Sequence, residues 1–286
     1  MDPAFARMLE SYQLYLEARN LSAATVQTYL ESLGYLGQYL VAHDLPSSLP
    51  EIQEEHIRGF ISYLLAHYSE STAHNRFRAI KTFLRWCVEE GEIERSPMPR
   101  RAPHVPQKSP EVLTGEQVDQ LRVACKGRGF DERRDDAIIV VLYDTGLRRE
   151  ELATLRVEDV DLRGKWLAVI RKGGDRDLVP IGKVAAQVLD RYARVRARHP
   201  LQARPEFWLG ANGPVTGSGI YQFVRDRAAQ AGVRNVHPHR FRHTSTHEHL
   251  AAGGQEGNVR TIMGWSDSSP MIRRYGKSMA AQRAHG

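Results

Sequence analysis

The chain has 286 residues, of which 41% are hydrophobic and 26% charged, a composition that excludes a disordered protein and allows two domains, each with its own core. Mean hydropathy is −0.48 and no apolar run approaches the roughly 18 residues of a membrane-spanning helix. The opening residues also lack the pattern of a signal peptide, so a cytoplasmic protein without membrane contact is expected.

Charge is distributed unevenly along the chain, although the net charge of the whole is only +6. Residues 1–96 hold 8 Lys and Arg against 13 Asp and Glu, residues 97–110 hold 3 against 0, and residues 111–286 hold 29 against 21. Neutralising phosphates and releasing their counterions supplies much of the affinity for nucleic acid. A basic segment followed by a basic half therefore favours a polyanionic partner.

Apolar residues recur at intervals of three and four through residues 1–96, which predicts an all-α domain. The helix expected over residues 71–91 carries Arg78, Lys81 and Arg85 together on one face, apart from its apolar residues. Such a basic stripe is usually only solvated. Its acidic surroundings here favour a second interpretation, in which the stripe contacts phosphates or base edges of DNA.

Residues 97–110 are predicted to be a linker, because they hold five of the chain's fourteen prolines and no acidic residue. Prolines at this density prevent a helix and favour an extended connector. Arg100, Arg101 and Lys108 make the segment cationic, which suits a linker lying along a phosphate backbone. A linker that is merely soluble is the alternative.

Residues 111–286 are predicted to form a mixed, mainly helical domain. A helix follows Thr114, and a buried helix then ends at a turn at Gly146 and leads into another. The segments KWLAVIR and DLVPI flank KGGDR, which predicts a β-hairpin with glycines in its turn. Helices are expected again at residues 183–198 and 218–231, and as one run over residues 238–263.

The stretch HPHRFRHTSTHEHL, residues 237–250, holds five of the chain's twelve histidines. His243 and His247 are four residues apart, the spacing of two zinc ligands on a helix. The stretch has no HExxH glutamate, the chain has no CxxC, and Arg240 and Arg242 would repel a metal ion. We therefore expect no bound metal, and a metal-dependent nuclease built on His237–His249 remains only as an alternative.

The arginines in this stretch favour phosphate as a ligand, because the planar guanidinium donates two parallel hydrogen bonds to phosphate oxygens. One arginine rarely suffices for phosphoryl chemistry. Arg148, in the segment TGLRREEL, is a candidate for the second, and Glu151 three residues later is spaced to hold a neighbouring guanidinium or amide.

Four segments, in this order, resemble the motifs of the tyrosine site-specific recombinases, the family of phage integrases and Xer-type and Cre-like enzymes. TGLRREELATLRVEDVDL is similar to the first-arginine box, VIRKGGDRDLVPI to the β2–β3 turn, HPHRFRHT to the His-x-x-Arg-His box, and MGWSDSSPMIRRYG to the last box. The resemblance implies catalytic roles for Arg148, Lys172, His239, Arg242, Trp265 and Tyr275, and supporting roles for Glu151 and His243.

The resemblance also implies a mechanism that needs no cofactor. Tyr275 attacks a DNA phosphate and becomes a 3′-phosphotyrosine, which stores the energy of the phosphodiester for rejoining. Arg148 and Arg242 stabilise the charge of the transition state and favour the phenolate. His239 accepts the phenol proton or donates to an oxygen, and Lys172 protonates the departing 5′ oxygen.

In the last box, Trp265 stands where most members have histidine and some have tryptophan. Its indole N–H can donate a hydrogen bond but cannot shuttle a proton. Two features depart from the family pattern, the spacing within this box and the length of the segment after it. The interval from Trp265 to Tyr275 is one residue longer than usual, which a loop over SDSSP is expected to absorb. A short segment, GKSMAAQRAHG, follows Tyr275 and could serve as an exchanged element between subunits.

The implied architecture is a two-domain clamp on DNA: a helical, SAM-like core-binding domain over residues 1–96 and an α+β catalytic domain over residues 111–286. The implied partner is duplex DNA with specific recombination sites. The protein is expected to be a monomer in free solution and to assemble into a tetramer on DNA. It is also expected to lack an arm-site-binding domain. The outcome would be integration, excision or resolution of DNA at the nucleoid. A catalytically silent DNA-binding relative and a type IB topoisomerase-like enzyme are alternatives.

Overall fold

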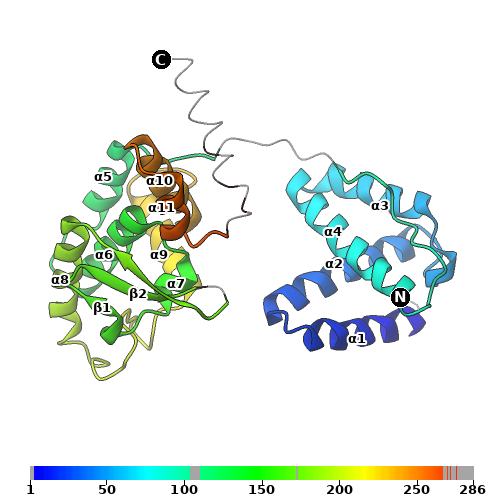
Figure 1. Ribbon diagram of the computed structural model, residues 1–286, viewed down its shortest axis with the longest axis horizontal. Coiled ribbons are helices and arrows are strands. Elements are labelled where there is room, and N and C mark those ends of the chain that lie inside the picture. Colours follow the sequence, from blue (N-terminus) through cyan, green and yellow to red (C-terminus); the bar gives the residue numbers. More distant parts are fainter. Residues whose placement is uncertain are drawn as a thin grey trace, which may run out of the picture. The chain divides into compact units, whose positions relative to one another are not determined.

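The computed structural model describes residues 3–103, 110–171, 173–266, 269, 271 and 275. The chain divides into two compact units, Met1–Lys108 and Ser109–Gly286 (Figure 1). None of the helices in the described part of the chain combines the length and the apolarity that a membrane span requires.

The described residues of the first unit form helices and connecting loops without a strand, as the spacing of apolar residues predicts. The helices are α1 Pro3–Ala18, α2 Ala23–Ala42, a 3₁₀ turn Leu49–Glu51, α3 Glu54–His67 and α4 Glu70–Glu89. Ser22 and Ser69 cap α2 and α4, each accepting a hydrogen bond from a backbone N–H three residues on. Around Tyr12, Phe83 and Trp86, aromatic rings pack at centroid distances of 5.0–6.0 Å and fill the core.

Helix α4 separates its apolar and basic residues as the sequence predicts. Its buried face, which packs on α2 and α3, includes Phe77, Ile80, Phe83, Leu84 and Cys87. Arg78, Lys81 and Arg85 are exposed. We call these three residues the α4 stripe.

The described part of the expected linker packs on the first unit. Met98 lies against its core, and the ring of His74 hydrogen-bonds the carbonyl of Pro103 at 3.4 Å. Arg100 and Arg101 are exposed and line a hollow of about 630 Å³ beside α3 and α4. These two arginines therefore belong to the surface of the first unit.

The second unit is mainly helical with one antiparallel sheet, so the predicted fold class is confirmed. Its elements are α5 Gly115–Ala124, α6 Phe130–Thr145, α7 Arg149–Ala153, a 3₁₀ turn Val157–Asp159, β1 Val160–Asp161, β2 Trp166–Ile170, β3 Arg176–Pro180, α8 Lys183–Arg196, α9 Gly217–Gln230, α10 Pro238–Ala251 and α11 Glu256–Ile262. Helix α6 is the centre of the core. It is buried over most of its length and packs on α5, α8, α9 and α10.

The strands pair in the order β1-β2-β3, with Trp166 opposite Pro180 and Ile170 opposite Arg176. Strands β2 and β3 form the predicted hairpin, whereas β1 is an addition of two residues that sequence periodicity misses. Side chains of β2 point alternately to two faces: Leu167 and Val169 are buried in the core, while on the other face Trp166 and Ile170 are exposed and the small Ala168 between them is buried.

The single helix expected over residues 238–263 is wrong. Helix α10 ends at Ala251, and Gly253 takes a left-handed φ of +82°, which ends the helical run before α11 begins at Glu256. This break turns the chain, so that the end of α11 at Met263 returns to contact α10 at Arg242. The turn therefore brings the last two motifs together.

Candidate active site

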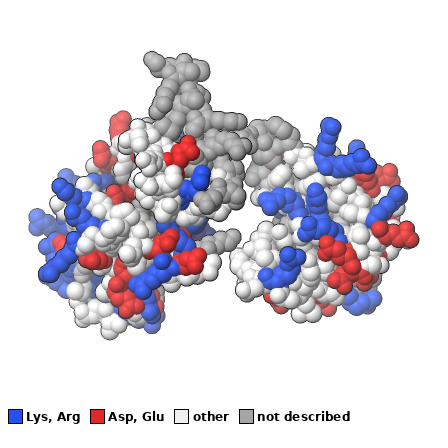
Figure 2. All heavy atoms as spheres, viewed as in Figure 1, with Lys and Arg blue, Asp and Glu red and all other residues white. Residues whose placement is uncertain are grey.

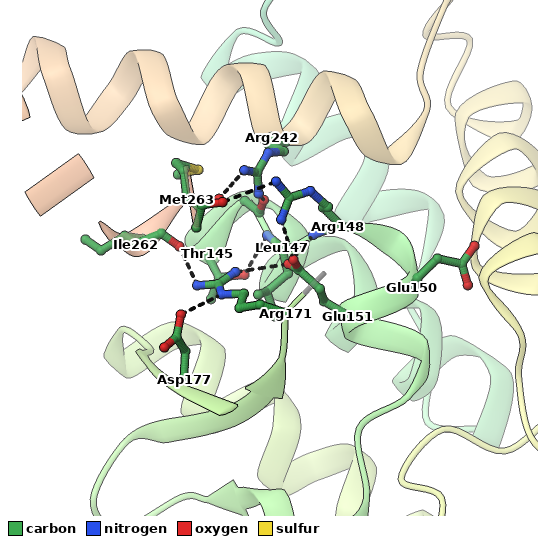
Figure 3. Close-up of polar contacts among 12 residues, drawn as sticks. Thr145, Leu147, Arg148, Glu150, Glu151, Arg171, Asp177, Arg242, Ile262 and Met263 are labelled. Carbon is green, nitrogen blue, oxygen red and sulfur yellow. Dashed lines mark hydrogen bonds and ion pairs between the residues drawn. The ribbon is translucent and has the colours of Figure 1, made fainter. Parts of the chain in front are cut away.

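Arg148 stands at the turn between α6 and α7, where Gly146 adopts a left-handed φ of +61°. The backbone N–H of Arg148 donates to Glu151 Oε2 at 2.9 Å, and its Nη1 donates to Oε1 at 2.6 Å (Figure 3). Glu151 is buried, so both of its oxygens are held in one geometry. The Arg148 side chain remains 36% exposed, which leaves part of its donor fork available to a ligand.

Arg242 approaches the same place from α10 and is only 3% exposed. Its Nη1 donates to the carbonyl of Gly146 at 2.8 Å, and its Nη2 donates to the carbonyl of Met263. Burial, followed by the nearby charge of Arg148, lowers the pKa of Arg242 to about 10. An anion that binds here would stabilise the charged form of Arg242, because its negative charge offsets both the cost of burial and the repulsion from Arg148.

A third guanidinium, that of Arg171 at the end of β2, completes the cluster and was not predicted. Its Nη1 donates to Glu151 Oε2 at 3.1 Å, its Nε to Asp177 Oδ2 at 3.0 Å, and its Nη2 to the carbonyl of Ile262 at 2.7 Å (Figure 3). The alternation of β2 was the available signal. It places Arg171 on the inner face with Leu167 and Val169, where a charged side chain needs partners.

The cluster carries excess positive charge. Two of the three guanidiniums, those of Arg148 and Arg171, bind the buried carboxylate of Glu151, whereas Arg242 binds backbone carbonyls. The only other carboxylate among these contacts is Asp177, whose side chain is 45% exposed. Water screens an exposed carboxylate far more than a buried one. The arrangement can therefore hold a doubly or singly charged phosphate without a metal ion.

Tyr275 is 1% exposed, and its hydroxyl is hydrogen-bonded to Nδ1 of His243. The indole of Trp265 stacks on the phenol ring at a centroid distance of 5.9 Å, and the guanidinium of Arg242 lies 5.5 Å from the Trp265 ring. His239 is exposed and lies edge-on to His243 at 4.5 Å. The structure thus places His243, expected only as a flanking residue, directly on the tyrosine hydroxyl.

Other histidines of residues 237–249 serve helix α10 itself. His237 caps the helix by accepting from the N–H of Arg240 at 3.2 Å, and His249 donates to the carbonyl of Ser245 at 2.7 Å. Over the described ranges, no group of three or more His, Cys, Asp or Glu side chains is arranged to hold a metal ion.

The other predicted residues lie either outside the described residues or in the first unit. Lys172 lies outside the described residues. The α4 stripe, Arg100 and Arg101 belong to the first unit, where they are exposed. Lys and Arg side chains are scattered among Asp, Glu and uncharged residues on the visible face of each unit (Figure 2).

A cluster of guanidiniums beside a histidine-bound tyrosine is suited to phosphoryl transfer by a covalent enzyme intermediate. Comparison with known families agrees with this class. Residues 111–282 match the model described as the phage integrase family, and residues 9–91 match the phage integrase N-terminal SAM-like domain.

Individual proteins resemble the chain over nearly its whole length. Tyrosine recombinase XerD of Listeria monocytogenes serotype 4b is 27% identical over 261 residues, covering 88% of this chain and 87% of its own. Tyrosine recombinase XerC of Corynebacterium efficiens is 29% identical over 273 residues, covering 93% and 86%. A lambda integrase dimer bound to a COC′ core site shares the fold, with a TM-score of 0.75 at 15% identity over 94% of this chain and 76% of that one.

The chain therefore belongs to the phage integrase family and is a site-specific tyrosine recombinase. Membership of this family gives it an enzymatic role in cleaving and rejoining DNA.

Proposed function

We propose that the chain cleaves and rejoins duplex DNA by type IB-like transesterification, with Tyr275 as the nucleophile. The observation that carries this proposal is the position of the Tyr275 hydroxyl, bonded to His243 and set beside Trp265 and Arg242. In the first step the phenol oxygen bonds to phosphorus and the bond to the 5′ oxygen breaks, which leaves a 3′-phosphotyrosine. The reverse attack by a 5′ hydroxyl rejoins the strand, so no external energy source is consumed.

Two protons move in this reaction. The phenol proton goes to a histidine, and the contact with Tyr275 favours His243 for this role over the predicted His239. The departing 5′ oxygen takes a proton, for which Lys172 remains the candidate by its place in the hairpin motif. Trp265 offers an indole N–H to a phosphate oxygen.

Arg148 and Arg242 are proposed to bind the nonbridging oxygens of the attacked phosphate. Both are held by protein oxygens before DNA arrives, so their charge needs little rearrangement during reaction. Glu151 is a supporting residue that fixes Arg148. Removing one such donor typically costs about 3 to 4 kcal/mol of transition-state stabilisation.

The proposed partner is duplex DNA carrying specific recombination sites, contacted by both units. The α4 stripe, Arg100 and Arg101 are proposed to contact DNA from the first unit, since all five are exposed cations. The lambda integrase dimer on its core site supports DNA binding by more than one subunit. We propose further that free monomers assemble into a tetramer on DNA. The tetramer would act at the nucleoid in integration, excision or resolution.

Covalent capture tests the nucleophile. Nicked genomic fragments are incubated with the wild type and with Tyr275→Phe, with and without EDTA, and protein-linked DNA is recovered after denaturation. We expect adducts, unaffected by EDTA, from the wild type and from the matched control Tyr143→Phe, which removes a hydroxyl on α6, but none from Tyr275→Phe. Adducts that persist in Tyr275→Phe would assign the nucleophile to another tyrosine. DNA binding without any adduct would favour a catalytically silent binder.

A further inference from the structure

We infer that Arg171 is a positioning residue for the recombination reaction, one that aligns Arg148 and Arg242 with the segment leading to Trp265. This inference rests on the proposed function. Arg171, itself in the hairpin motif, binds Glu151 of the first-arginine box, Asp177 of β3 and the carbonyl of Ile262, the residue directly before the last box.

The link to Arg148 runs through Glu151. Oxygen Oε2 of Glu151 accepts from both the backbone N–H of Arg148 and Nη1 of Arg171, while Oε1 accepts from Nη1 of Arg148. Arg171 therefore opposes rotation of the carboxylate that fixes the Arg148 fork. Without it, the half-exposed Arg148 side chain would keep its charge but lose a defined orientation.

The link to the last motif runs through consecutive carbonyls at the end of α11. Ile262 accepts from Arg171 at 2.7 Å, Met263 accepts from Arg242, and Gly264 accepts from Arg148 at 3.4 Å. Carbonyls at a helix end lack partners within the helix and carry its partial negative charge. Three guanidiniums thus hold three successive carbonyls, and the next residue along is Trp265.

Only arginine can make this set of contacts. Its planar fork places five donors in fixed directions, whereas lysine presents one rotating ammonium. The Arg171 side chain is only 7% exposed and takes three separate acceptors, two of them carboxylates. It is thus well satisfied by protein groups, which distinguishes it from Arg148 as a direct ligand for phosphate.

The variants Arg171→Met, Arg171→Lys and Asp177→Asn test this role in the full-length protein. Asp177→Asn loosens Arg171 at a half-exposed partner and leaves the buried guanidinium in place, so it tests the inference even if Arg171→Met folds poorly. Arg196→Met is the matched control. Arg196 is also buried and bound to backbone carbonyls, but these belong to residues 202–207.

Single-turnover cleavage is measured at saturating DNA on a nicked duplex carrying the site that covalent capture identifies. Two substrates are compared, one with a normal scissile phosphate and one with a neutral methylphosphonate. For Arg171→Met we expect a fall of about 100-fold in the cleavage rate on the phosphate, the order expected when a reacting group is misplaced by about 1 Å. DNA affinity should be unchanged. The loss should shrink at least tenfold on the methylphosphonate, because a neutral centre depends less on aligned guanidiniums.

The other variants sharpen the result. Arg171→Lys should fall between wild type and Arg171→Met, and Asp177→Asn should show a smaller loss with the same preference for the methylphosphonate. In an Arg148→Ala background, adding Arg171→Met should lower the cleavage rate only slightly further, because the two residues act together.

Equal losses on the two substrates, or a folded Arg171→Met protein that cleaves like Arg196→Met, would overturn the inference and leave Arg171 a purely structural residue. Failure of the wild type to form an adduct would instead refute the proposed function.

Discussion

The Nδ1 atom of His243 is hydrogen-bonded to the hydroxyl of Tyr275, and the ring of His239 lies edge-on against the ring of His243. His243 and His239 lie one helical turn apart on α10, so they share a face. Motif order places the role of proton acceptor on His239, whereas the geometry of the protein without DNA places His243 on the phenol.

We expect His243→Phe to lower the rate of adduct formation by about 100-fold or more, because it removes the proposed proton acceptor on the phenol. Single-turnover cleavage of the captured site by His243→Phe, His239→Phe and the control His247→Phe, one turn further along α10, measures this. A larger loss in His239→Phe than in His243→Phe would return the acceptor role to His239.

The backbone of Gly264 lies directly against the arginine cluster. Its φ is +56°, and a Cβ there would lie 3.0 Å from Nε of Arg171. We expect Gly264→Ala to lose about 1 to 2 kcal/mol of unfolding free energy from the left-handed backbone, and additionally to lower the cleavage rate by displacing Arg171.

Gly253→Ala is the control for Gly264→Ala, because Gly253 also has a left-handed φ but meets nothing within 4 Å. Chemical denaturation and single-turnover cleavage are measured on both variants. If Gly253→Ala lowers cleavage as much as Gly264→Ala, backbone strain alone accounts for the effect.

The α4 stripe is expected to contact DNA phosphates. Each contacted phosphate contributes about −0.9 to the slope of log affinity against log salt concentration, so the triple alanine variant of Arg78, Lys81 and Arg85 should have a slope shallower by about 2 to 3. Arg85 also forms an ion pair with Glu89 at 3.6 Å. Because both groups are exposed, this pair is weak and should compete little with a DNA phosphate for Arg85. Arg7→Ala, an exposed cation on α1, is the control; an unchanged slope in the triple variant would mean that the stripe is only solvated.

The two free cysteines predict a pH dependence of stability. Burial raises the pKa of Cys87 and Cys125 from an ordinary value near 9 to about 12. Above pH 9 the unfolded chain loses these protons while the folded chain keeps them, so the free energy of unfolding falls as pH rises from about 9 to 12. By pH 10 each thiol should lower the free energy of unfolding by about 1 kcal/mol.

Urea denaturation at pH 8 and pH 10 checks this sign. Between pH 8 and pH 10, the free energy of unfolding should fall less in Cys87→Ala and in Cys125→Ala than in the wild type. This comparison does not depend on how much stability each variant loses at pH 8 through the missing sulfur. Equal falls in all three proteins would show that the thiols do not titrate differently on unfolding.

Local spacing was sufficient to locate most elements and one part of the site. The i, i+3 spacing of Arg148 and Glu151 predicted their pairing, because residues three apart at a helix start lie side by side. The two apolar segments around KGGDR predicted the hairpin of β2 and β3. Strand β1 was missed because two residues are too few for a period, and the break at Gly253 was missed because the apolar spacing continues across it.

The sequence by itself determined the fold class, the order of the motifs and the residue types available for phosphoryl transfer, since these depend on composition and short-range spacing. Only the tertiary structure decided which groups meet. Arg171 contacts the carbonyl of Ile262 across 91 positions, and Arg242 contacts that of Gly146 across 96. Such contacts arise from how helices and sheet pack around one core, and backbone carbonyls carry no side-chain signature that a sequence could display.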